Sequence, residues 1–193
     1  MTDGDGRLVQ PFPQPGGALK AAFDALAELD GQVSRGMDPK VDSAALPKPW
    51  DPATITNTDM RMQLWTWLSA VVDWVNHEYA WDVNEMIPAC WPLHPHLVRD
   101  IAVLADQRRA AGLLFNSDHL QVWHQTTLPE FRARMRAQIQ QHCDEGHAVW
   151  PARARHGRQS SIEVWEARNA VLQRDLQAAV TERSWGASRT PQP

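Results

Sequence analysis

The stretch MRMQLWTWLSAVVDWVNHEYAW, residues 60–81, decides the fold class of the chain. At 100° per residue its large apolar side chains fill a continuous arc of roughly half the helical wheel. Polar residues, among them Thr66, Asp73 and Asn76, fill the opposite side. The stretch therefore predicts an amphipathic helix of about five turns that buries one face.

Helical periodicity continues on the C-terminal side of this stretch. The segment 96–115 aligns apolar residues on one face with Arg108 in its middle, and Pro129 opens a further helical pattern. A buried charge needs a partner, so an ion pair of Arg108 with Glu78 or Asp73 is predicted. No stretch shows the alternation of a strand. The sequence predicts an all-α fold, a compact bundle of about four to five helices with a tethered N-terminal helix and a long C-terminal helix.

The N-terminal region differs in composition from the bundle. Residues 1–57 are rich in proline and glycine, which predicts a disordered or linker region with one short amphipathic helix over residues 18–30. The apolar face of this helix suits a partner's groove or the bundle itself, and consists of Leu19, Phe23 and Leu26. The bundle domain is predicted over residues 58–185, followed by a disordered tail over residues 186–193.

The C-terminal helix carries a heptad pattern. Ser160 and Glu163 have the spacing of a capping box at its start. The seam residues then recur at alternating spacings of three and four, and are Ile162, Trp165, Asn169, Leu172 and Leu176, continued by Ala179. Such a seam predicts contact with a protein partner or a second copy of the chain. The alternative is that the helix packs on its own bundle.

The segment IPACWPLHPH, residues 87–96, raises the question of a metal site. Cys90, His94 and His96 are residue types that bind zinc. Pro88, Pro92 and Pro95 disfavour helix at the residues before them, and the spacing matches no common zinc finger. A rigid turn is therefore favoured over a metal site. A second cluster, residues 142–147 around Cys143, is interpreted as an edge of the core.

Global composition excludes several classes. Ten tryptophans outnumber one tyrosine and four phenylalanines, and each buried indole N–H needs an acceptor. The formal charge of -4 gives no global attraction for nucleic acid, and two cysteines make no disulfide framework. No apolar run is long enough to span a membrane, and no secretory leader is present, which together predict a cytoplasmic protein. No Gly-rich phosphate loop or HExxH motif supports an enzyme.

Two groups of basic residues leave DNA binding open. They are Arg132, Arg136, Arg153, Arg155 and Arg158. Clustered arginines can contact phosphates, although acids elsewhere outnumber the basic residues.

Three segments together resemble small uncharacterised helical proteins of actinobacterial phages, plasmids and integrative conjugative elements. The segments are LWTWLSAVVDWVNHEYAW, IPACWPLHPHLVRDIAVL and WHQTTLP, followed by an arginine-rich helix. The features in common with those proteins are a tryptophan-rich first helix, the turn from Cys90 to Pro95, and the pair Trp123 and His124. They cover roughly residues 60–136 of this chain. The resemblance implies a mobile-element setting and carries no assigned activity.

The leading hypothesis is a non-enzymatic helical adaptor of such an element, acting without a cofactor through protein–protein contacts. One alternative is a DNA-associated accessory protein of conjugation or replication. Another is a zinc-binding or thiol enzyme.

Overall fold

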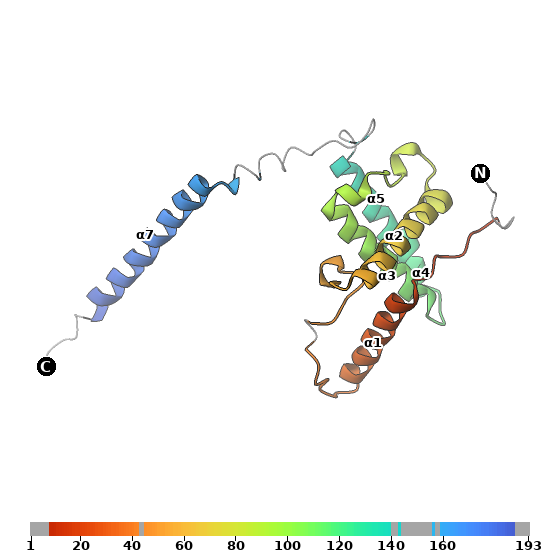
Figure 1. The fold of residues 1–193 in the computed structure, drawn as a ribbon, viewed down its shortest axis with the longest axis horizontal. Coiled ribbons are helices and arrows are strands. Elements are labelled where there is room, and N and C mark those ends of the chain that lie inside the picture. Colours follow the sequence, from red (N-terminus) through yellow and green to blue (C-terminus); the bar gives the residue numbers. More distant parts are fainter. Residues whose placement is uncertain (1–7, 43–44, 140–142, 144–155, 157–158, 188–193) are drawn as a thin grey trace. The chain divides into compact units, whose positions relative to one another are not determined.

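A computed structural model gives the fold of the chain (Figure 1). It describes residues 8–42, 45–139, 143, 156 and 159–187, and of residues 178–187 the backbone alone. The chain is all-α, as predicted, and no strand occurs within these described ranges. It divides into two compact units, unit 1 over Met1–His147 and unit 2 over Ala148–Pro193. This division differs at both ends from the predicted one, because unit 1 includes the N-terminal region and unit 2 holds the C-terminal helix.

Unit 1 is a bundle of α-helices, and its longest connections lie between α1 and α2 and between α2 and α3. Its helices are α1 (Gly17–Ser34), α2 (Thr58–Tyr79), α3 (Pro95–Gly112), α4 (Asp118–Val122) and α5 (Leu128–Ile139). Short 3-10 turns lie at Pro52–Thr54, Val83–Glu85 and Trp91–Leu93, and a π-helical turn at Trp123–Thr127 joins α4 to α5.

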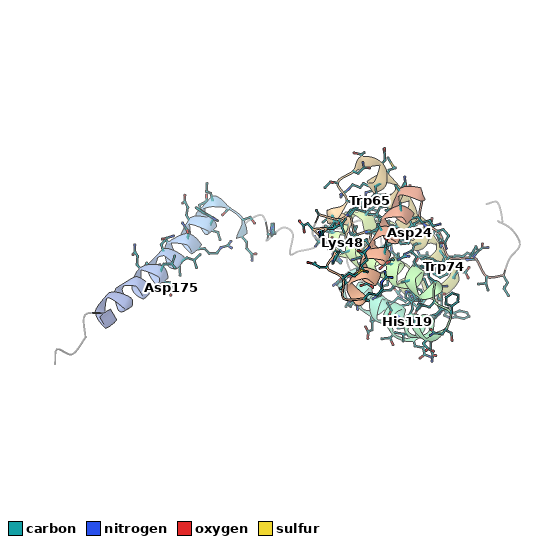
Figure 2. The ribbon with its side chains drawn as sticks, turned by 90° about the horizontal axis from the view of Figure 1, so that it is seen from below. Asp24, Lys48, Trp65, Trp74, His119 and Asp175 are labelled. Carbon is teal, nitrogen blue, oxygen red and sulfur yellow. The ribbon has the colours of Figure 1, made fainter. Side chains whose placement is uncertain are left out.

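Helix α2 has the amphipathic character that the sequence predicts. The Asn57 side chain accepts a hydrogen bond from the Met60 N–H, which satisfies one of the free donors at the start of the helix. The buried face comprises Leu64, Trp67, Leu68, Val71, Val72, Trp74 and Val75. Trp65 and Trp74 mark positions along this helix in Figure 2. Burial of this face makes α2 a central element of the core.

The segment before α1 is ordered and lies along α2, although the sequence predicts disorder for this segment. The indole N–H of Trp67 donates to the Pro13 carbonyl, and that of Trp74 donates to the Gln10 carbonyl, each at 3.0 Å. The Phe12 ring meets both indoles edge-on. A proline-rich segment leaves carbonyls without helical or sheet partners, and buried indoles need such acceptors. The tryptophans of α2 therefore hold this segment in place.

Helix α1 belongs to the core of unit 1. Leu19 is 0% exposed and Phe23 is 3% exposed, and Phe23 stacks on Trp50 while it meets Trp67 edge-on. The sequence leaves two roles open for this helix, contact with a partner or docking on the bundle. In the structure the helix docks on the bundle. Leu19 and Phe23 are thus part of the core, and of the predicted face Phe23 and the half-buried Leu26 line an open groove.

Arg108 finds aromatic partners in place of the predicted acid. Its guanidinium carbon lies 5.2 Å from the ring centroid of Phe12, 5.5 Å from that of Trp74 and 5.7 Å from that of Trp123. No ion pair of Arg108 occurs in the described part of the chain. The negative faces of aromatic rings attract a cation, and this attraction grows when water is excluded. Three rings therefore take the place of Glu78 or Asp73.

Unit 2 contains α7 (Ile162–Ala187). The seam side chains Ile162, Trp165, Leu172 and Leu176 are 57–69% exposed, and Asn169 is partly buried. At the start of the helix, Ser161 and not Ser160 provides the hydrogen bond to Glu163, and this bond lowers the pKa of the Glu163 carboxyl. The predicted pairing of Ser160 with Glu163 is thus replaced by a side-chain contact between Ser161 and Glu163.

Candidate functional site

The connection between α2 and α3 is a fixed turn. The Asn76 side chain accepts from the Ile87 N–H at 2.8 Å and donates to the Ile87 carbonyl at 3.0 Å. Trp91 is buried and its ring lies 5.6 Å from that of Trp65 on α2. Further on, the His94 N–H donates to the Trp91 carbonyl, and the His94 carbonyl accepts from Val98 in α3. Backbone bonds and an indole anchor therefore fix the turn on both sides of its Cys and His residues.

Two cysteines and one histidine converge beside this turn. The Nε2 atom of His94 lies 3.4 Å from the Cys90 sulfur and 3.3 Å from the Cys143 sulfur. All three candidate ligand atoms lie within 4.8 Å of one another. His94 is 3% exposed, and both cysteines are half-buried. We call Cys90, His94 and Cys143 the Cys2His cluster.

The Cys2His cluster combines parts of both predicted Cys/His groups. Cys90 and His94 come from the segment 87–96, and Cys143 comes from the group that was interpreted as a core edge. His96 is not one of the three, although its ring centroid lies 5.7 Å from that of His94. The neighbours of Cys143 at 142 and 144–147 lie outside the described residues.

The surroundings of the cluster disfavour a free thiolate. Burial, and then the hydrogen bond and charge of Cys143, raise the pKa of the Cys90 thiol to about 11. Without a nearby cation, Cys90 is therefore protonated at neutral pH. This argues against Cys90 as an activated nucleophile, because such a cysteine needs a lowered pKa.

A pocket lies against the cluster. Its volume is about 460 Å³, and Cys90 and Cys143 are among its lining residues. Most of the other lining side chains are apolar, including Met86, Met135 and Ile139, while Arg136 adds a positive charge. A small molecule in this pocket could reach both sulfurs.

The predicted DNA-contacting arginines are only partly placed. Arg132 forms an ion pair with Glu85, Nη1 to Oε2 at 3.4 Å, and its side chain is 14% exposed. It is therefore part of the bundle's internal structure and not a free phosphate contact. Arg136 is exposed. The remaining three, Arg153, Arg155 and Arg158, lie outside the described residues.

Comparisons of the chain with protein-family models, curated proteins and solved structures found no match. The resemblance to proteins of mobile elements therefore stays a prediction. None of the described helices is both long enough and apolar enough to cross a membrane.

Proposed function

We propose that the chain is a non-enzymatic helical adaptor that acts through protein–protein contacts, and that α7 carries its contact surface. The observation that supports this most is the exposed seam of α7, where Ile162, Trp165, Leu172 and Leu176 are each more than half exposed. Helices in proteins gain most of their stability from packing an apolar face. Clustered exposed apolar side chains are typical of an interaction surface.

A second copy of the chain fits this seam. Spacings of three and four let two parallel helices interlock their side chains, with each seam residue facing its own copy. Asn169 would then meet Asn169, the arrangement in which a buried Asn is best tolerated. In the same register Arg168 would flank Gln173 of the other copy, and Ser161 would flank Glu166, so that no like charges oppose each other. The adaptor is thus proposed as a dimer through α7, which can present two copies of unit 1.

The setting of the adaptor rests on the resemblance. A mobile element of an actinobacterial host, with the protein in the cytoplasm where both thiols stay reduced, accords with the two cysteines and with the adaptor role. DNA binding has less support, because Arg132 is engaged with Glu85.

A charge placed on the seam tests the proposal. We expect the wild-type chain to have a dimer mass by light scattering at micromolar concentration, and Leu172→Glu to give a monomer, because two glutamates would face each other. Val171→Glu is the matched control, since Val171 is a neighbouring exposed residue of α7 outside the seam. A monomeric wild-type chain, or equal loss of dimer in both variants, would contradict the proposal.

A further inference from the structure

The distances within the Cys2His cluster match those around a tetrahedral zinc ion. Zinc binds thiolate sulfur at about 2.3 Å and imidazole nitrogen at about 2.0–2.1 Å, which at tetrahedral angles places sulfur and nitrogen about 3.6 Å apart and two sulfurs about 3.8 Å apart. The two sulfur–nitrogen distances are 3.4 Å and 3.3 Å. The cluster's limit of 4.8 Å between any two ligand atoms includes the required sulfur–sulfur distance. Shifts of a few tenths of an ångström would complete the geometry.

Without a metal, the cluster can be connected by hydrogen bonds only in a chain from one thiol to the other and on to the imidazole. Each nitrogen of a neutral imidazole either donates one proton or accepts through one lone pair. Nε2 of His94 nevertheless has two sulfurs at almost the same distance. Nε2 can form one full hydrogen bond to a sulfur, and the two thiols can hydrogen-bond to each other. One cation between the three atoms would instead bind each of them directly.

The position of the three residues in the fold also suits a metal. Cys90 and His94 are held by the turn that Asn76 and Trp91 anchor, and His94 directly precedes α3. Cys143 comes from beyond the end of α5, a place 49 residues further along the chain than His94. A metal ion would therefore link the start of α3 to the segment that follows α5.

The donor atoms select the kind of metal. Two sulfurs and one imidazole nitrogen suit zinc, whereas magnesium and calcium need oxygen ligands. Two thiolates would balance the charge of Zn²⁺, and binding would release the two thiol protons to solvent. Three protein ligands leave one tetrahedral position, as in zinc sites that bind water or substrate.

We propose that Cys90, Cys143 and Nε2 of His94 bind one Zn²⁺ ion, and that its fourth position accepts water or a small ligand that enters through the adjacent pocket. His96 is not a ligand of this site. The site is distinct from the α7 seam, so it does not depend on the adaptor proposal.

Elemental analysis of variants tests the ligand set. Protein purified reduced and without chelator, then supplied with Zn²⁺ and desalted, should retain about one zinc per chain. Cys90→Ser, Cys143→Ser and His94→Ala should each retain much less, and His96→Ala should retain as much as the wild type. The helical circular dichroism signal of each variant shows whether it has folded. Absence of zinc from the wild type, loss of zinc in His96→Ala, or full retention in Cys143→Ser would overturn the proposal.

A second measurement needs no variant. Titration of the metal-free wild-type chain with Co²⁺ should produce the strong visible bands of tetrahedral cobalt and a thiolate-to-cobalt charge-transfer band, both saturating near one equivalent and both removed by Zn²⁺. Added imidazole should then shift the visible bands if the fourth position is open. A weak octahedral spectrum, or a Cys90–Cys143 disulfide in protein prepared under nitrogen, would overturn the proposal.

Discussion

Replacement of Leu19 by alanine should destabilise unit 1 strongly, because Leu19 of α1 is 0% exposed. Removing a fully buried leucine side chain costs about 3 kcal/mol, the sum of lost apolar burial and of the cavity that remains. For a unit of this size each kcal/mol lowers the thermal midpoint by about 3 °C, so the expected shift is about 10 °C. Thermal unfolding followed by tryptophan fluorescence and by helical circular dichroism would measure it.

The matched control is Val33→Ala on the same helix. Val33 is 55% exposed, so its replacement should change the free energy of unfolding by less than about 0.5 kcal/mol. Both variants should be measured in a chelating buffer, because a metal that binds only the folded state would shift the midpoint. Equal small shifts in the two variants would refute the reasoning, since they would show that α1 contributes no buried surface to the core.

Two further predictions concern Arg108 and the basic groups. Burial raises the pKa of Tyr79, the single tyrosine of the chain, and the nearby charge of Arg108 opposes this shift. Ultraviolet titration should therefore give a Tyr79 pKa above 10 in the wild type. In Arg108→Gln the Tyr79 pKa should be still higher, because the opposing charge is lost. Because the pKa of Tyr79 is higher in the folded state, its titration contributes stability that is fully present below the unfolded-state pKa and is lost as the pH rises through the folded-state pKa. A Tyr79 pKa at or below 10 would contradict the assignment. For DNA, we expect no salt-sensitive shift of a duplex by the wild-type chain, whereas a shift that disappears when Arg153, Arg155 and Arg158 are replaced by glutamate would establish the DNA-associated alternative instead.

The elements that the sequence predicts well are those whose signal is local. The apolar arc of residues 60–81 implies a helix with one buried face, and α2 has that helix and that face. Pro95 suits the first position of a helix because its missing N–H costs nothing there, and α3 begins at Pro95. Both signals depend on residues within a few turns of each other, which is the range over which periodicity and capping act.

The N-terminal segment and Arg108 show where local rules fail. Proline and glycine around residues 8–16 indicate disorder, yet the indoles of Trp67 and Trp74 bind carbonyls of this segment from more than fifty residues away. The chain is rich in tryptophan, and the positions around Arg108 are apolar. Together these two features indicate that aromatic rings can contact the Arg108 guanidinium. An acid is only one of the partners that a buried cation can have, and in this chain rings are more abundant on the buried faces.

Sequence spacing could identify only part of the Cys2His cluster. Cys90 and His94 are four residues apart across a proline-rich turn, so the pair can be identified as candidate ligands from the sequence. Cys143 has no spacing relationship to them, because its place beside His94 depends on how α5 packs against α3 and the turn. His96 belongs to the same sequence segment but lies on α3, outside the group of three ligand atoms. Each of the two sequence segments that carry a cysteine also carries a histidine, and the structure brings Cys143 beside Cys90 and His94. The convergence of Cys143 on Cys90 and His94, and not the spacing within either segment, is therefore the observation on which the proposed metal site depends.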